Sequence, residues 1–179
     1  DANLTHIWKP LLHEVAAGAL NADVDELSYA GHAKRHHFHF ALGRMSGLDR
    51  SRQEIILAPH FDEADMILPE RRIGYDTLVI AIGSNTNDFG TPGARDNCIF
   101  LDRRSAAERF HRTFLNEYLK AGTHMPPEDK HCNIAIIGAG ATGVELAAEL
   151  NHSAHELTEY GFDQIKPENV TITIIEAAD

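Results

Sequence analysis

The sequence has little cysteine, little positive charge and no long apolar run. Its two cysteines, Cys98 and Cys132, form no C-x-x-C pair, which excludes zinc-ribbon and thioredoxin-like chemistry. Lysine and arginine number 16 against 27 acidic residues, and the resulting formal net charge of −11 disfavours nucleic-acid binding. No stretch approaches the roughly 18 apolar residues of a membrane helix. We therefore expect a soluble, reduced, intracellular chain without nucleic-acid partners.

The length and overall composition are those of a globular chain. With 179 residues, 43% of them hydrophobic and 24% charged, the sequence can bury a core as one domain or two small ones. It begins at Asp1 without a methionine or a signal peptide, and it ends at Asp179 just after a strand-like run. Length and composition alone leave open whether this is a whole protein.

Histidine is abundant, with 12 residues, and three of them cluster in the segment RHHFHF. If this segment is a strand, two histidines of its H-x-H pair share one face. A pair with no third ligand nearby is weak evidence for a metal. We favour a solvated strand here and predict no metal site.

Hydrophobic periodicity predicts helices and a β-meander in the first half of the chain. Apolar residues recur at helical spacing in PLLHEVAAGAL, and Asp23 is a suitable start for a second helix. The predicted helices are 10–20 and 24–35, and the predicted strands are 38–42, 54–58 and 72–83. The apolar run LVIAI in the last strand is typical of a strand that is buried on both faces.

The second half alternates between helical and strand patterns. After a loop at 84–97, a helix is predicted over 102–121, with a capping box of Ser105 and Glu108 and a stop at Gly122. The remaining segments are a linker at 122–131, a strand at 133–137, a helix from 144 to about 160 and a strand at 170–176.

A glycine loop follows the strand at 133–137 and carries the clearest chemical signal. Gly138, Gly140 and Gly143 form G-x-G-x-x-G between a strand and a helix. The first glycine permits a tight turn, the second lets a pyrophosphate approach the backbone, and the third allows close packing of helix and strand. The helix N-terminus then favours the negative charge of the dinucleotide. The pattern predicts dinucleotide binding, and the alternative is a glycine-rich turn that binds nothing.

Two acidic residues belong to this predicted site. Glu176 ends the next strand, where a carboxylate accepts hydrogen bonds from both ribose hydroxyls of NADH and repels the 2′-phosphate of NADPH. It lies 33 residues after Gly143 instead of about 20, so residues 151–169 must lengthen the helix or form an excursion. Glu145, predicted in the first helical turn, either complements the helix dipole or assists proton movement beside the bound dinucleotide.

Several segments resemble known flavoproteins. YDTLVIAIGS at 75–84 and IAIIGAGATGVELAAEL at 134–150 are similar to the flavoproteins in which an NADH domain is inserted into an FAD domain. HIWKPLLHEVAAGAL at 6–20, SNTNDFGTPG at 84–93 and NCIFLD at 97–102 resemble the bacterial type II NADH dehydrogenases. Residues 1–97 contain no cysteine, which disfavours the reductases that act on disulfides or peroxides.

The resemblance implies roles for single residues. It implies FAD contacts for Asp1, which would hold the adenosine ribose, and for Lys9, Pro10, Leu11 and Gly83, which lie in segments beside the flavin. It implies an NADH site at Gly138, Gly140, Gly143 and Glu176, and it places Glu145 near nicotinamide and flavin as a catalytic residue in proton coupling. The implied cofactors are FAD and NADH.

The resemblance also implies the fold and its division. We expect an α/β fold with Rossmann-like parallel sheets and a small antiparallel β-meander, as a fragment of a two-dinucleotide-domain flavoprotein. We expect residues 1–100 to form a partial FAD-binding domain and residues 101–131 to form a helix and a linker. Residues 132–179 are expected to form the first β-α-β of an NADH-binding domain. The first FAD glycine motif, the late FAD motif and the membrane-docking segments of the family are not in the sequence.

The function implied for the longer protein is transfer of hydride from NADH to FAD and of electrons to a membrane quinone. Such an enzyme is peripheral, on the cytoplasmic side of the bacterial inner membrane. We expect the fragment alone to be inactive. The alternatives are a module that at most binds a dinucleotide and a different FAD-dependent NADH reductase with a soluble acceptor. Unpaired sheet edges and exposed apolar faces favour association between copies of the fragment.

Overall fold

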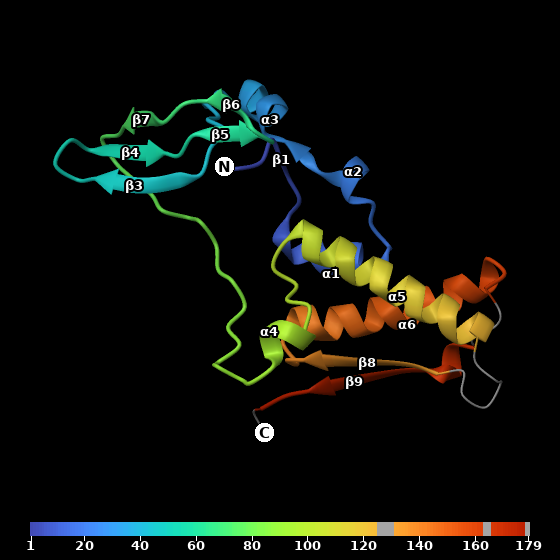
Figure 1. Ribbon diagram of the computed structural model, residues 1–179. Coiled ribbons are helices and arrows are strands. Elements are labelled where there is room, and N and C mark those ends of the chain that lie inside the picture. Colours follow the sequence, from blue (N-terminus) through green and yellow to red (C-terminus); the bar gives the residue numbers. More distant parts are fainter. Residues whose placement is uncertain (125–130, 163–165, 178–179) are drawn as a thin grey trace. The chain divides into compact units, whose positions relative to one another are not determined.

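The computed structural model describes residues 1–124, 131–162 and 166–177 (Figure 1). The chain divides into two compact units. The first consists of Asp1–His6 and Glu26–Gly83, and the second of Ile7–Asp25 and Ser84–Asp179. Segment 7–25 therefore belongs with the C-terminal helices and sheet, while the residues on either side of it belong to the meander.

A β-α-β unit forms the base of the second unit. Strands β8 (Cys132–Ile137) and β9 (Val170–Ile175) pair in parallel, with Ile134 opposite Ile172. Parallel neighbours need a long crossover, and α6 (Ala141–Glu159) provides it. The predicted β-α-β is confirmed, and the lengthened helix accounts for most of the extra spacing before Glu176.

A short helical segment opens the second unit. The 3-10 helix η1 (Lys9–Leu11) carries Pro10 in its first turn, where the missing N–H costs nothing, and α1 (Leu12–Ala17) follows it directly. Gly18 ends α1 in the left-handed conformation, with φ of 90°. The predicted helix 10–20 is thus confirmed, although it is shorter than predicted.

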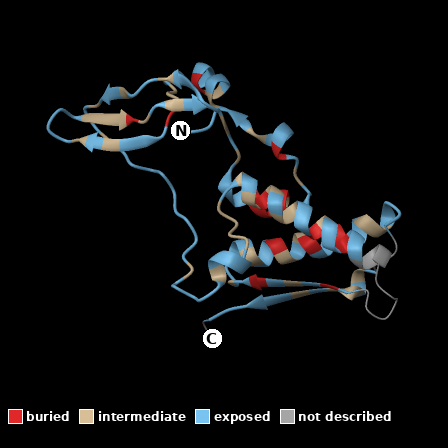
Figure 2. Cartoon of the chain, in the orientation of Figure 1, coloured by how far each residue is buried: buried red, intermediate tan, exposed pale blue. Residues whose placement is uncertain are grey.

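The core of the second unit lies where α1, α5 (Arg104–His124), α6 and β8 face one another (Figure 2). Its buried members are Leu12, Val15, Ala16, Ala17, Ala22, Ala107, Phe114, Tyr118, Cys132, Ile136, Leu146 and Leu150. Ala107, Phe114 and Tyr118 of α5 are buried in this core, whereas Leu119 is 44% exposed. The described residues of the unit also contain the short helices α2 (Ala22–Asp25), α4 (Ala94–Asn97) and η3 (Pro167–Asn169).

The two predicted ends of α5 are wrong. The helix begins at Arg104, so Ser105 lies inside the first turn and cannot be the N-cap. The carboxylate of Glu108 instead contacts Nε of Arg104 at 2.6 Å, one turn earlier. Gly122 does not stop the helix, which continues to His124. A glycine in a helix interior costs only about 1 kcal/mol, which a well-packed helix tolerates.

The first unit is mainly antiparallel. One sheet has the order β3-β4-β7 and consists of β3 (Met45–Asp49), β4 (Glu54–Leu57) and β7 (Arg71–Gly74). Between β4 and β7 in the sequence, β5 (His60–Asp62) and β6 (Asp65–Leu68) form a separate hairpin. An antiparallel sheet is present as predicted, and β4 and β7 correspond to two of the three predicted strands, but the sequence patterns missed β3, β5 and β6. The remaining elements are β1 (Thr5–His6), which pairs with β2 (Leu27–Ser28), and α3 (Tyr29–His36).

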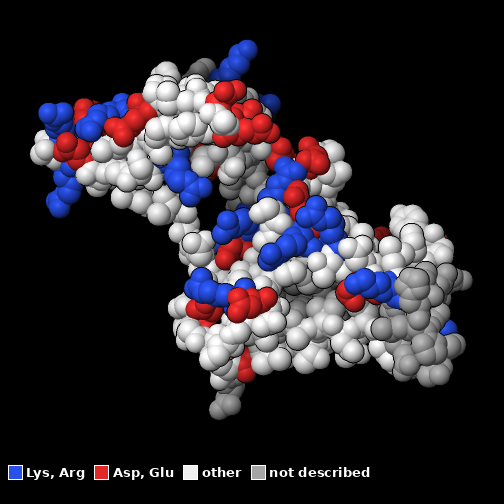
Figure 3. Space-filling view, viewed as in Figure 1, with Lys and Arg blue, Asp and Glu red and all other residues white. Residues whose placement is uncertain are grey.

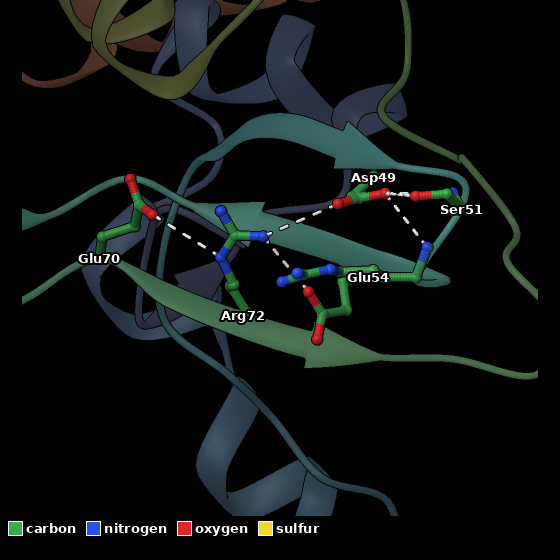
Figure 4. Close-up of polar contacts among 6 residues, drawn as sticks. Asp49, Ser51, Glu54, Glu70 and Arg72 are labelled. Carbon is green, nitrogen blue, oxygen red and sulfur yellow. Dashed lines mark hydrogen bonds and ion pairs between the residues drawn. The ribbon is translucent and has the colours of Figure 1, made fainter.

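Polar contacts hold the open face of this sheet (Figure 4). Nη1 of Arg72 lies 3.3 Å from a carboxylate oxygen of Glu54 on the neighbouring strand and 4.0 Å from Asp49. Asp49 also accepts hydrogen bonds from the backbone and the hydroxyl of Ser51 in the β3–β4 turn. The bond from the Ser51 hydroxyl is the largest of the effects that lower the pKa of Asp49. These contacts join all three strands and their first turn.

Two predictions for residues 24–42 are wrong. The predicted helix 24–35 is two helices, α2 and α3, with β2 between them. Ser28 caps the second helix, because its hydroxyl oxygen accepts a hydrogen bond from the backbone N–H of Gly31 at 3.4 Å. The predicted strand 38–42 does not form. His36 ends α3 and His37 follows it with φ of 58°, so the histidine cluster marks a helix end. Within the described residues no group of three possible metal ligands is present.

The apolar run LVIAI at the end of the first unit does not form the buried strand that we predicted. Of the predicted strand 72–83, only the residues up to Gly74 are paired, in β7. Val79, Ile80 and Ile82 are 80%, 56% and 85% exposed, where we predicted burial on both faces. A strand depends on a hydrogen-bonded neighbour, and within the described residues no segment pairs with this run.

Candidate functional site

The glycine loop begins with a sharp turn out of β8. Gly138 has φ of 108°, a conformation that side chains other than hydrogen strongly disfavour. Its N–H donates to the carbonyl of Ile175 at 2.8 Å, so the turn stays tied to the end of β9. This bond fixes the first residue of the loop against both strands of the parallel pair.

The other two loop glycines have different surroundings. A Cβ on Gly143 would lie 2.1 Å from the carbonyl oxygen of Gly138, so the first turn of α6 packs directly on the loop backbone. A Cβ on Gly140 would meet nothing within 4 Å. Gly140 is the N-cap of α6 and therefore presents open backbone at the positive end of a 19-residue helix. The geometry fits a close approach by a pyrophosphate at Gly140 and close packing at Gly143.

Glu176 lies beside this loop, directly after β9. Its Oε2 accepts a hydrogen bond from the N–H of Ala139 at 2.7 Å, and its Oε1 accepts one from Ala177 at 2.7 Å. Despite the unusual sequence spacing, the strand-end acid therefore contacts the glycine loop.

Glu145 lies in the second turn of α6, because the helix begins at Ala141 and not at the third glycine. Its side chain is 53% exposed. Oε2 of Glu145 lies 3.6 Å from Nδ1 of His13, a buried residue of α1. The sequence patterns did not single out His13, whose only signal was a polar residue within an otherwise apolar helix.

A second polar network joins three of the segments that resemble the type II NADH dehydrogenases, 6–20, 84–93 and 97–102. Nζ of Lys9 donates to the carbonyl of Ser84 at 2.6 Å and lies 3.6 Å from Asp102. Asp102 also accepts bonds from the N–H and hydroxyl of Thr86, at 2.9 and 2.7 Å. Burial opposes ionisation of Asp102, but the Thr86 bonds and the Lys9 charge outweigh it, so the pKa of Asp102 lies below its usual value. The sequence patterns did not identify Asp102 as a functional residue.

The residues predicted to contact FAD are divided between the units. Asp1 and Gly83 belong to the first unit and 9–11 to the second, so neither unit alone gathers them. The carboxylate of Asp1 accepts bonds from the N–H of Asn3 at 2.9 Å and the hydroxyl of Tyr29 at 3.2 Å. Gly83 has φ of 74° and open space around it.

A separate hollow of about 560 Å³ opens between the end of α1, α2 and α5. It is lined by Val15, Gly18, Leu20, Asn21, Ala22, Asp23, Arg104, Glu108, His111 and Arg112. Figure 3 shows basic side chains gathered over this part of the molecule with acidic ones beside them. Arg104 contacts both Asp23 and Glu108 there. None of the predicted site residues lines the hollow.

Sequence comparison identifies the class of protein. Residues 2–179 match the family model of the pyridine nucleotide-disulphide oxidoreductases, and the chain belongs to this family. The chain is 45% identical to the type II NADH:quinone oxidoreductase of Haemophilus influenzae, over 99% of the chain and 43% of that protein. It is 28% identical to the enzyme of the same name from Staphylococcus aureus, over 99% of the chain and 41% of that protein. The predicted resemblance is confirmed.

A plant mitochondrial protein and a solved structure extend the comparison. The external alternative NAD(P)H-ubiquinone oxidoreductase B1 of Arabidopsis thaliana mitochondria is 31% identical, over 96% of the chain and 31% of that protein. The structure of NDH2 from Plasmodium falciparum in complex with RYL-552 superposes with a TM-score of 0.79 at 22% identity, over 99% of this chain and 36% of that one. This likeness confirms the fold class. The chain spans less than half the length of these relatives.

None of the helices in the described part of the chain combines the length and apolarity needed to cross a membrane.

Proposed function

We propose that the glycine loop between β8 and α6 binds NADH. The observation that carries this proposal is the contact of Glu176 with the Ala139 N–H at 2.7 Å, which joins the strand-end acid to the loop. The pyrophosphate would lie over Gly140, where the backbone is open and the helix dipole is favourable. The ribose hydroxyls would donate to Glu176, whose charge disfavours the 2′-phosphate of NADPH.

We further propose that the chain is part of an NADH:quinone oxidoreductase, as its relatives are named. FAD bound in such an enzyme accepts hydride from NADH and supplies electrons to a membrane quinone. In this enzyme, the chain would bind and orient the nicotinamide cofactor and would provide Glu145 for proton movement. The enzyme would lie at the membrane surface, on the cytoplasmic side of the bacterial inner membrane.

The division into family domains is part of the same proposal. Residues 1–100 would belong to the FAD-binding domain, 101–131 would connect the domains, and 132–179 would open the NADH-binding domain. Asp1, Gly83 and the segment 9–11 are the proposed FAD contacts. Because they are divided between the two compact units, we expect the 179-residue chain alone to hold no FAD tightly and to turn over nothing.

A second candidate function is dinucleotide binding without catalysis. One observation favours it: the glycine loop, α6 and Glu176 all lie in the second unit. A third, an FAD-dependent NADH reductase with a soluble acceptor, is consistent with the same site. The acceptor of the enzyme that contains the chain, a quinone or a soluble compound, distinguishes the first candidate from the third.

Titration of the purified chain with NADH tests the shared element of these functions. Binding should be saturable, and Gly140→Val should abolish it, because the branched side chain occupies the place of the pyrophosphate. The matched control is Gly74→Val, which also adds a side chain at a glycine with open space around it. An unchanged affinity in Gly140→Val, or no binding at all by the unaltered chain, would overturn the proposed site.

A further inference from the structure

His13 of α1 is an unusual member of the core. It is 8% exposed, and its ring nitrogen Nδ1 is buried without a hydrogen-bond partner. Nδ1 faces Oε2 of Glu145 at 3.6 Å, and Nε2 faces Oε1 of Glu14 at 3.9 Å. Each nitrogen of the imidazole therefore has a carboxylate within ion-pair distance but slightly beyond hydrogen-bond distance.

The other buried polar side chain of the described residues shows the contrast. Ser153 of α6 donates its hydroxyl to the carbonyl of Ala17 at 3.0 Å, which connects α6 to α1. That hydrogen bond satisfies the Ser153 hydroxyl, which thereby has a structural role. A buried nitrogen without a partner costs free energy, whereas an apolar side chain of similar size would fill the site of His13 at no such cost. The imidazole thus has little structural purpose unless it acts on a neighbour.

Glu145 is the neighbour that can respond. Its side chain is 53% exposed, whereas His13 is 8% exposed on α1, the helix that packs against α5 and α6. A small rotation of the Glu145 side chain would bring its carboxylate oxygen from 3.6 Å to the distance of about 2.8 Å that is usual for a charge-assisted hydrogen bond. The buried ring thus offers a point against which the more exposed carboxylate can be held.

We propose that His13 is a positioning residue for Glu145. The imidazole holds the carboxylate at the start of α6, close to the glycine loop, and exchanges a proton with it. In that exchange the O–H bond of protonated Glu145 breaks and an N–H bond forms at Nδ1, leaving a carboxylate and an imidazolium. The catalytic meaning of the pair rests on the proposed function, but the contact between the two side chains does not.

The ring nitrogens of His13 report the pair directly. In the ¹⁵N-labelled 179-residue chain, Glu145→Gln should shift the Nδ1 resonance of His13, and Glu145→Asp should retain more of the original shift. Glu149→Gln, a change of the same kind one turn further along α6, should leave the resonance in place. A His13 resonance that is indifferent to Glu145→Gln would overturn the proposal, because an imidazole that holds this carboxylate must respond to the loss of its charge.

Variants of His13 separate positioning from packing. His13→Leu preserves an apolar filling and should fold with an unchanged or higher melting temperature, yet the ¹³C resonance of the Glu145 carboxyl should move. His13→Asn places an amide nitrogen near the position of Nδ1 and should partly restore that resonance. Equal Glu145 resonances in all three proteins would contradict the proposal. If the chain binds no NADH while the resonances respond as expected, the proposed function fails and the pair stands.

Discussion

The carboxylate of Glu176 and the backbone N–H of Ala139 lie 2.7 Å apart, although they are separated by 37 positions in the sequence. Ala139 is inside the glycine loop and Glu176 directly follows β9, so this bond joins the two parts of the proposed NADH site. A ribose entering that site would compete with the Ala139 N–H for the same carboxylate. We therefore expect Glu176 both to tie the glycine loop to the end of β9 and to serve as the ribose acceptor.

Replacing this carboxylate should weaken and broaden nucleotide binding. We expect Glu176→Ala to lower the affinity for NADH by roughly ten- to a hundredfold, because hydrogen bonds to a charged group contribute about 1.5–3 kcal/mol. Affinity for NADPH should fall less or rise, since the repulsion of its phosphate is removed. Calorimetric titration with both nucleotides measures the ratio, with Glu168→Ala as a control at an exposed acid outside the loop. A selectivity ratio unchanged in Glu176→Ala would refute the role of this residue.

The packing of the loop predicts a stability difference between two glycines. Gly143→Ala should lower the free energy of unfolding by about 1–3 kcal/mol, because the new Cβ would lie 2.1 Å from the carbonyl oxygen of Gly138. Gly140→Ala, with open space around it, should cost less than about 1 kcal/mol. Urea unfolding followed by circular dichroism compares the two. Equal losses would show that the close contact does not constrain the loop.

Acidification should weaken the network around Asp102. The pKa of Asp102 is lower in the folded chain than the ordinary value of 3.8 for an aspartate, so its ionised form stabilises the fold above that value. This contribution is fully present at pH 7 and is lost as the pH falls below 3.8 through the lower folded pKa.

Asp102→Asn should therefore destabilise the chain at pH 7, by about 1 kcal/mol, and less at pH 3. Unfolding in urea at the two pH values measures the difference, and Asp96→Asn, at an exposed position of α4, is the control. A loss of stability in Asp102→Asn that is the same at both pH values would show that ionisation of Asp102 does not contribute.

A pair of left-handed glycines tests the packing of α1 on α5. Gly18 and Gly161 have φ of 90° and 92°, so alanine should cost about 1 kcal/mol of backbone strain at either. At Gly18 the new Cβ would also lie 2.3 Å from Cε1 of His111, whereas at Gly161 it meets nothing.

Gly18→Ala should therefore destabilise the chain more than Gly161→Ala, and adding His111→Ala should reduce the difference. Thermal unfolding of the single and double variants gives the coupling. If the effects of Gly18→Ala and His111→Ala on the melting temperature are simply additive, the close contact between these two positions does not affect stability.

The β-α-β unit was predictable because its signals are local. An apolar run, three glycines at fixed spacing and an amphipathic helix constrain successive residues, and β8, α6 and β9 appeared as predicted. The same local signals misled at residues 79–82, where the apolar run is exposed. Its strand character depends on a neighbour to pair with, and the pattern of one segment contains no information about that neighbour.

The two polar contacts that sequence patterns missed are both long-range. His13 is placed opposite Glu145 by the packing of α1 on α6, and Asp102 is placed beside Lys9 by the approach of α5 to the chain before α1. Glu145 has no residue of opposite charge three or four positions away, and the lysine beside Asp102 lies far earlier in the sequence. Such pairs are visible only once the elements are packed.

By itself, the sequence determined the family, the glycine loop and the alternation of helix and strand, since these depend on residue types at short fixed spacings. The tertiary structure decided which side chains meet. It brought Glu176 to the loop despite an unusual spacing, moved Glu145 to the second turn of α6 and placed a buried imidazole against it. The physical reason is that local spacing restricts backbone conformation, whereas contacts between distant residues depend on how complete elements bury their apolar faces against one another.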